Sequence, residues 1–162
     1  MEIILGERTE ETVAIYFAKS QQEEIRVFLP QKARTLEEAL TDYRETLLPD
    51  STSYGRTILF NRRYVGDIWC YGIHTEEEPG AMLSYCVFEK SCLNCGVATE
   101  AVKLFLRETA QRFGLKTIGA FVYEANAASI RVLEKSGFQM IERFTEDGVA
   151  SRYYQKRIRI DQ

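Results

Sequence analysis

The stretch "KSCLNCGVATEA", residues 90–101, decides how the chain is interpreted, because it joins a β-rich segment to a long amphipathic helix. It carries two cysteines at the spacing of metal ligands, then a glycine, then small residues where the helix should begin. Three interpretations follow: half of a zinc site, a redox pair of thiols, or a loop that binds a phosphate. Each makes a different demand on the rest of the chain.

The first two interpretations depend on Cys92 and Cys95, which form a CxxC pair. A structural zinc site usually shows two close ligand pairs, but Cys70, His74 and Cys86 fall at irregular spacings in or beside expected strands. A redox pair belongs at a helix N-terminus in a thioredoxin-like context, and no second redox element is visible. A thiol-redox or metal-binding module therefore stays as an alternative, and we expect no metal.

The phosphate interpretation accounts for more of the stretch. Backbone N–H groups at a helix start have no intrahelical partner, and the helix dipole places partial positive charge there, so a pyrophosphate is a natural occupant. Gly96 lets the backbone approach a ligand closely, Asn94 tolerates a positive φ, and Ala98 is too small to block the approach. A plain strand-to-helix turn is the alternative for these residues.

Composition narrows the class of protein. With 162 residues, 45% of them hydrophobic and 28% charged, the chain is typical of a globular protein, and we expect one domain over residues 1–162. A net charge of −3 without a basic stripe argues against a nucleic-acid partner. No signal peptide, membrane-spanning run or secreted disulfide framework is recognisable, so we expect a cytoplasmic location and no membrane partner.

Hydrophobic periodicity predicts a mixed α/β chain. The predicted helices cover residues 9–20, 35–48, 98–113 and 126–137. The predicted strands cover residues 56–60, 64–73, 81–88, 117–123, 138–144 and 151–160. The strand, crossover helix and strand over 81–122 should be parallel, and the flanking hairpins should be antiparallel, which gives a mixed sheet.

Two motifs resemble the GNAT superfamily of acyl-CoA-dependent N-acetyltransferases. The pyrophosphate loop of that family reads Gln/Arg-x-x-Gly-x-Gly/Ala, and Gly96 and Ala98 in "LNCGVATEA" match it. The run "GVATEA" is similar to the branch that includes ribosomal-protein N-terminal acetyltransferases. Two positions depart from the pattern, because Leu93 replaces the usual Gln or Arg and Asn94 stands where another glycine is common.

The second motif is "NAASIRVLEKSGF", residues 126–138, which resembles the family's second cofactor motif, an Asn that opens a helix ending in Gly-Phe. One predicted helix and one predicted strand separate the two motifs, as in the family. Together with "YVGDI" at 64–68, the resemblance covers residues 55–158. It implies a GNAT-like fold, whose central mixed, mostly antiparallel sheet is splayed at the acetyl-CoA site and flanked by helices.

The resemblance also implies acetyl-CoA as cosubstrate, bound where two adjacent strands splay apart. Backbone groups of one strand would bond the pantetheine arm, amides of the loop before the helix would hold the pyrophosphate, and two residues of the second motif would face the thioester. The implied cofactor-binding residues are Cys86, Val87, Phe88, Asn94, Cys95, Gly96, Val97, Ala98, Thr99, Asn126 and Ser129.

Direct transfer requires a neutral amine and a group that protonates the departing thiolate. Many family members use a tyrosine seven residues after the motif Asn, but that position is Leu133 here. We therefore expect Ser129 to hydrogen-bond or protonate the sulfur, the alternative being that it only completes a helix N-terminus. Glu142 is the candidate general base and Glu124 a second one, although a solvated surface carboxylate is the favoured interpretation of each.

The expected function is an N-acetyltransferase that moves an acetyl group from acetyl-CoA to a primary amine, on a protein N-terminus or a small molecule. Pairing is common in the family, so a homodimer is one expected assembly. Two alternatives stay open. One is a degenerate member that binds CoA without efficient transfer, suggested by Leu93, Asn94 and Leu133; the other is a thiol-redox or metal module that uses Cys92 and Cys95.

Overall fold

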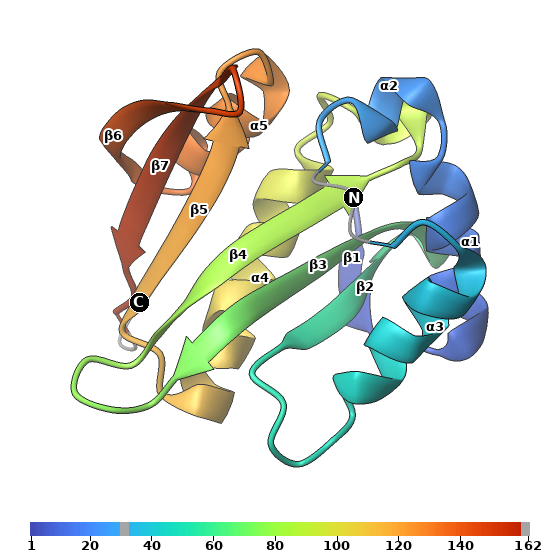
Figure 1. Ribbon diagram of the computed structural model, residues 1–162, viewed down its shortest axis with the longest axis horizontal. Helices are drawn as coiled ribbons and strands as arrows, with labels where there is room; N and C mark the ends of the chain where they lie inside the picture. Colours follow the sequence, from blue (N-terminus) through green and yellow to red (C-terminus); the bar gives the residue numbers. More distant parts are fainter. Residues whose placement is uncertain (30–32, 160–162) are drawn as a thin grey trace.

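A seven-stranded sheet organises the part of the chain that the computed structural model describes, residues 1–29 and 33–159. Its strand order is β1-β2-β3-β4-β5-β7-β6 (Figure 1). Neighbouring strands are antiparallel except for the parallel pair β4 and β5. The strands are β1 (Ile3–Gly6), β2 (Tyr54–Phe60), β3 (Arg63–His74), β4 (Gly80–Val87), β5 (Thr117–Tyr123), β6 (Gln139–Glu146) and β7 (Val149–Arg157).

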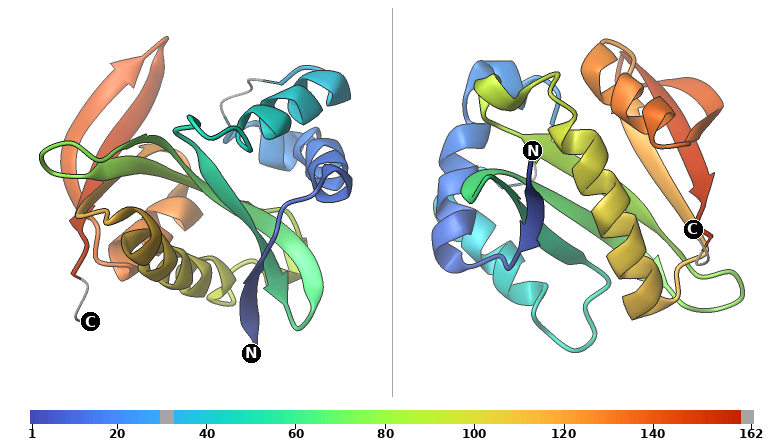
Figure 2. Two further views of the ribbon diagram at one scale, coloured as in Figure 1. Left: turned by 90° about the horizontal axis from the view of Figure 1, so that it is seen from below. Right: turned by 180° about the vertical axis from the view of Figure 1, so that it is seen from behind.

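Helices lie on both faces of this sheet. Figure 2 shows α4 and α5 on one face, while α1, α2 and α3 lie on the other face over the half that contains β1 to β4. Within the described residues, no helix has the length and apolar character needed to cross a membrane. The helices are α1 (Glu10–Ser20), α2 (Glu23–Arg26), α3 (Leu36–Glu45), α4 (Val97–Phe113) and α5 (Ala127–Lys135), with a short 3₁₀ helix, η1 (Lys90–Cys92).

Two tight turns set the register of the antiparallel hairpins. Asn61 and Arg62 join β2 to β3 with φ angles of 47° and 72°, and Asp147 and Gly148 join β6 to β7 with φ angles of 51° and 78°. Two consecutive residues with positive φ give a turn whose twist matches that of the flanking strands. Both hairpins were predicted from the sequence, and both are confirmed.

Side-chain caps fix where the N-terminal helices begin. The hydroxyl of Thr9 accepts a hydrogen bond from the Thr12 amide at 3.1 Å, and the hydroxyl of Thr35 accepts one from the Glu38 amide at 3.1 Å. Each bond satisfies a backbone donor that the first helical turn leaves unpaired. The Glu38 carboxylate reaches the amide of Arg34 instead of returning to Thr35, so α3 has only half of a capping box.

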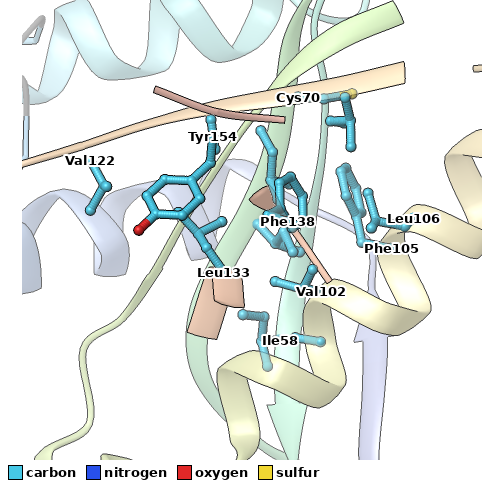
Figure 3. Close-up of a cluster of buried hydrophobic side chains, with 14 of the residues drawn as sticks. Ile58, Cys70, Val102, Phe105, Leu106, Val122, Leu133, Phe138 and Tyr154 are labelled. Carbon is cyan, nitrogen blue, oxygen red and sulfur yellow. The ribbon is translucent and has the colours of Figure 1, made fainter. Parts of the chain in front are cut away.

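The core lies between the sheet and the helices α4 and α5. Val102, Phe105 and Leu106 point from α4 into a buried cluster with Ile58 and Cys70 of the sheet (Figure 3). Burying a side chain of this size contributes about 1.5–3 kcal/mol to folding. This packing holds the long helix across β1, β3 and β4, and thereby fixes where its first turn lies.

The sequence predictions hold for most elements. The mixed, mostly antiparallel sheet and the parallel pairing around α4 are confirmed. The prediction missed β1, which pairs with β2 along the edge of the sheet from Ile3↔Phe60 to Gly6↔Thr57. A strand of four residues is too short to show a clear alternation. The last predicted strand, 151–160, corresponds to β7, and residue 160 lies outside the described residues.

Candidate active site

β4 and β5 are paired over only a small part of their length. Three residue pairs join them, from Gly80↔Thr117 to Met82↔Gly119. Beyond that point β4 stays paired with β3, and β5 stays paired with β7. The two strands therefore splay apart, and beyond the three pairs each presents to the other a backbone edge that is not paired with a strand.

A cavity of about 1020 Å³ lies at this splay. Its walls come from β4, β5, the loop before α4, the first turns of α4 and α5, the region of α2 and the β6–β7 hairpin. The predicted cofactor residues that line it are Cys86, Val87, Phe88, Asn94, Gly96, Ala98, Thr99, Asn126 and Ser129. Two predicted residues are not among the lining: Val97 is buried, and the thiol of Cys95 points to the carbonyl oxygens of Ser91 and Leu93.

The loop before α4 has the backbone shape of an anion cradle. Asn94 and Gly96 have φ angles of 63° and 81°, and Gly96 starts the helix without a side-chain cap. The amide of Glu100 is the first to donate within the helix, to the carbonyl oxygen of Gly96 at 3.0 Å. The amides before it are therefore available to a ligand at the positive end of the helix dipole.

Basic side chains stand beside this cradle, and the sequence prediction missed them. Arg131 of α5 donates to the amide oxygen of Asn94 at 3.4 Å, and it lines the cavity together with Lys135 and Lys90. Arg131 and Lys135 are four residues apart, so they share one side of α5. That spacing in the second motif was the signal that could have identified them.

A pair of hydroxyl groups lies on the cavity wall. The phenol oxygen of Tyr85 is 2.9 Å from the hydroxyl oxygen of Ser129, and it also donates to the Ser129 carbonyl at 3.3 Å. Asn126 caps α5 by accepting from the Ser129 amide at 3.2 Å, so the Ser129 hydroxyl is not needed as the cap. Burial raises the pKa of Tyr85, which keeps the phenol protonated at neutral pH.

The sequence prediction missed Tyr85. On the predicted strand 81–88 it lies on the same face as Leu83 and Val87, so the pattern predicts one more core residue there. Leu133, which stands where many family members have a tyrosine, is buried in the core beside Tyr154 (Figure 3).

The predicted bases lie away from the lining of the cavity. Glu142 is an exposed residue of β6, and neither it nor Glu124 is among the described residues that line the cavity. Glu124 accepts a hydrogen bond from Arg152 at 2.5 Å and lies 3.5 Å from Arg143, and the Arg152 guanidinium lowers the pKa of the Glu124 carboxyl. A carboxylate with a lowered pKa is a weaker base.

A cluster of buried polar side chains lies next to the Cys86 thiol, on the face of the sheet that α1 covers. Asp67 of β3 is opposite Cys86, is 1% exposed and accepts a hydrogen bond from the Tyr64 phenol at 2.6 Å. Arg8 lies 3.6 Å from its other carboxylate oxygen. Burial raises the pKa of Asp67 to about 6, and the pKa of the Cys86 thiol to about 12. The Cys86 thiol is therefore protonated, and it also shares a hydrogen bond with Tyr16.

The CxxC pair is split between core and surface. Cys92 is 5% exposed, whereas Cys95 is exposed, and all four cysteines are free. Within residues 1–29 and 33–159, no group of three or more histidine, cysteine or acidic side chains is placed to hold a metal ion. The two thiols thus face different environments.

Comparison with known proteins identifies a family. Residues 3–139 match the family described as "Acetyltransferase (GNAT) domain", which is most of the chain. That match gives no support to the thiol-redox or metal-binding alternative. No curated protein matches the sequence.

Solved structures share the fold at low sequence identity. The spermidine N-acetyltransferase from Vibrio cholerae, in complex with CoA and spermine, has a TM-score of 0.84 at 12% identity, over 96% of this chain and 95% of that one. RimL, a ribosomal L7/L12 alpha-N-protein acetyltransferase in complex with CoA, has a TM-score of 0.83 at 17% identity, over 98% and 96%. The aminoglycoside acetyltransferase AAC(6')-Ib, in complex with coenzyme A, has a TM-score of 0.81 at 18% identity, over 96% and 95%.

Proposed function

The chain belongs to the GNAT acetyltransferase family, and on that premise we propose that it transfers an acetyl group directly from acetyl-CoA to a primary amine. One observation carries the proposal: the cavity that begins at the uncapped start of α4 continues into the splay between β4 and β5. An elongated ligand with an anionic end and an amide-rich arm fits such a cavity. Acetyl-CoA has this chemistry, and it supplies an activated acetyl thioester.

The residues that would hold acetyl-CoA follow from their chemistry. Backbone amides at the start of α4, around Gly96 and Ala98, would donate hydrogen bonds to the pyrophosphate, with Arg131 adding positive charge. The exposed backbone edge of β4 at Cys86 and Val87 would hydrogen-bond the amides of the pantetheine arm, as an added strand would. The side-chain oxygen Oδ1 of Asn126 is used by the cap, so the side-chain nitrogen Nδ2 is the group that can reach a ligand.

Transfer forms a C–N bond, breaks a C–S bond, adds a proton at sulfur and removes one from nitrogen. We assign the proton at sulfur to Ser129, whose hydroxyl is held by Tyr85 at 2.9 Å. The phenol of Tyr85 has one proton, and when it is donated to the Ser129 hydroxyl oxygen instead of the Ser129 carbonyl, the serine can donate onward, so the two hydroxyls act in series. Tyr85 is a positioning residue in this scheme.

The base depends on the acceptor. An α-amine, with a pKa of about 7.7–8.0, loses its proton with little help at neutral pH, whereas a lysine amine at about 10.4 requires a strong base. Glu142 stays a prediction for this role. The acceptor class that we propose is a primary amine on a protein N-terminus or a small molecule.

We also propose a cytoplasmic location, which agrees with the four free cysteines. One domain over residues 1–162 and a homodimer both stay predictions.

Calorimetry with CoA tests the proposal directly. We expect saturable binding to the full chain, and release of free thiol from acetyl-CoA when a panel of primary amines is added. Binding without thiol release from any amine would identify a degenerate, CoA-binding member. Absence of binding would overturn the proposal. The variant with Cys92→Ser and Cys95→Ser should bind CoA within about twofold of the unchanged chain, since the contacts proposed for this loop come from the backbone.

A further inference from the structure

The cavity extends beyond the splay onto a face of the sheet that no described helix covers. In Figures 1 and 2, α1, α2 and α3 stand over the half that contains β1 to β4, and the same face of β5, β7 and β6 is open. Phe121, in the middle of β5, is 56% exposed there and lines the cavity. A large aromatic side chain exposed at the centre of a sheet is often part of a binding surface.

Phe121 belongs to an aromatic cluster with defined geometry. Its ring lies edge-to-face with Phe144 of β6 at 5.8 Å between centroids, and against Tyr153 of β7 at 5.2 Å. Tyr153 crosses over β5 at Gly119, where an added Cβ would lie only 2.6 Å from the phenol oxygen. Glycine at this position is therefore what allows the Tyr153 ring to support Phe121.

A second group of apolar side chains lines the same cavity. Ile25, Phe28 and Leu29, from α2 and the turn that follows it, line the cavity together with Phe121 and Phe144. Phe28 is 37% exposed. These apolar walls and the Ser129 hydroxyl belong to one continuous cavity, so a ligand between the walls can reach the proposed site of transfer.

The charges along the cavity are balanced. Its carboxylates are Glu24, Glu146 and Asp147, and its cations are Lys90, Arg131 and Lys135. Glu24 is already paired with Lys90 at 3.0 Å. Arg131 and Lys135 stand beside the cradle proposed for the pyrophosphate, so Glu146 and Asp147 are the carboxylates left for an amine, which is too few for a ligand with three or more ammonium groups. Both lie at the end of the β6–β7 hairpin, and together they can offset at most two ammonium charges.

We propose that the acceptor is a primary monoamine that carries an aromatic ring on a short carbon chain, with the ring held between Phe28 and the cluster of Phe121 and Phe144. This inference rests on the function proposed above, and it names the class of amine. Aromatic side chains bind an aromatic ligand through edge-to-face and stacked contacts, and they also favour a nearby ammonium group. A polyamine or an aminoglycoside lacks the ring and carries too many charges.

The test measures thiol release from acetyl-CoA with matched acceptors. We expect kcat/KM for 2-phenylethylamine to exceed that for ethanolamine, spermine and kanamycin by about tenfold or more, because the apolar walls bind only the ring-bearing amine. Two tripeptide amides, Phe-Gly-Gly and Ser-Gly-Gly, form the second arm. In each arm the compound with the aromatic ring should have the higher kcat/KM. The arm with the higher kcat/KM shows whether the natural acceptor is a small amine or a chain N-terminus.

Two variants locate the effect. Phe121→Ala and Phe28→Ala should each raise the KM for 2-phenylethylamine by about fivefold or more while leaving the affinity for CoA unchanged, since an aromatic contact is lost only at the acceptor end. Ile141→Ala is the matched control: Ile141 is 55% exposed on β6, is not among the lining residues, and should change neither value.

The outcomes separate this inference from the function on which it rests. If CoA binds and spermine or kanamycin is acetylated as well as 2-phenylethylamine, or if no amine shows a ring preference, the acceptor class is wrong and the acetyltransferase function stands. If Phe121→Ala and Ile141→Ala behave alike, the aromatic wall is not the acceptor site. If CoA does not bind, both proposals fail.

Discussion

At the scale of single residues, the contact between Tyr85 and Ser129 is the most specific feature of the cavity wall. Tyr85 comes from a strand and Ser129 from a helix 44 positions later, and their hydroxyl oxygens meet at 2.9 Å. The phenol stays protonated because burial raises the pKa of Tyr85. The pair therefore offers a proton donor on the cavity wall. Leu133, at the position where many family members have a tyrosine, is instead buried in the core.

Tyr85→Phe removes the phenol and keeps the ring. We expect kcat for thiol release to fall by about tenfold with the KM for acetyl-CoA within about twofold, because Tyr85 positions the Ser129 hydroxyl that acts on the chemical step. Ser129→Ala should lower kcat by a larger factor than Tyr85→Phe does. The double variant should have the same kcat as Ser129→Ala alone, since Tyr85 acts through Ser129. Tyr43→Phe, which removes a phenol bonded to the Arg8 carbonyl, is the control. Fully additive effects of the two changes would contradict the scheme.

Asp67 predicts a pH dependence of stability. Its pKa is about 6 in the folded chain against 3.8 for an ordinary aspartate, because burial disfavours the carboxylate. A raised pKa stabilises the fold below pH 4, and this contribution is lost as pH rises through 6. Relative to Asp67→Asn, the free energy of unfolding should therefore fall by about 2 kcal/mol between pH 4 and 7.

Urea unfolding of both chains at pH 4, 5, 6 and 7 measures the difference. The Asn variant leaves Arg8 without a carboxylate partner at every pH in the series, which shifts its whole curve without changing the slope that Asp67 contributes. Parallel curves for the two chains would show that Asp67 does not titrate in this range.

At the scale of elements, α4 is bounded by two glycines with left-handed backbone. Gly96 begins the helix with φ 81°, and Gly114 ends it with φ 66°. An added Cβ would meet nothing within 4 Å at either position, so both are required for their φ angles and not by crowding. The two ends thus offer a pair of left-handed glycines, one at the N-cap and one at the C-cap, of which only Gly96 is among the residues that line the cavity.

Gly96→Ala and Gly114→Ala should each cost about 1 kcal/mol of folding free energy, because both force a left-handed residue with a side chain. Only Gly96→Ala should weaken binding of CoA, by about tenfold, because its methyl group stands beside the amides that are proposed to hold the pyrophosphate. Thermal unfolding and calorimetry of the two variants provide the comparison. Equal losses of affinity would remove the start of α4 from the binding site.

The same elements show how far the sequence alone could lead. The helices α4 and α5 were predicted to within about two residues, because their apolar faces repeat regularly and because Gly114 and Asn126 mark their ends. The loop between β4 and α4 was found from its glycine. These are local signals, and local structure follows them.

Other features were beyond local signals. Alternation along β4 places Tyr85 on a covered face, but it cannot tell a core position from a cavity wall, because that depends on how far β5 stays paired. The alternation along β5 places Phe121 on one face of the strand. It cannot show that this face is left open by the described helices, as Figure 2 shows. The cavity carboxylates come from α2 and from the β6–β7 hairpin, which only the assembled fold brings near Ser129.

At the scale of the whole molecule, the sheet consists of two halves with a narrow connection. β1 to β4 form one half and β5, β7 and β6 the other, and only three residue pairs join β4 to β5. Each half keeps its own antiparallel pairing, so the facing edges can open without loss of the hairpins. A ligand in the cavity would contact both halves and so oppose their separation.

Hydrogen exchange should report this coupling. On addition of CoA, we expect backbone amides in 83–88 and 120–123 to exchange about tenfold more slowly or better, because the ligand replaces the missing strand pairing and stabilises the closed arrangement. Amides of β2 and of the adjoining part of β3 are already paired and serve as the internal control. Uniform protection across the chain would indicate general stabilisation, and unchanged exchange at the splay would place the ligand elsewhere.

The split between Cys92 and Cys95 gives the molecule a built-in labelling position. Three thiols are buried and Cys95 alone is exposed among the four, one residue before the glycine that starts α4. A maleimide dye applied to the folded chain should therefore attach at one place without any engineering. Its emission would then follow the filling and emptying of the nucleotide end of the cavity in real time, turnover by turnover.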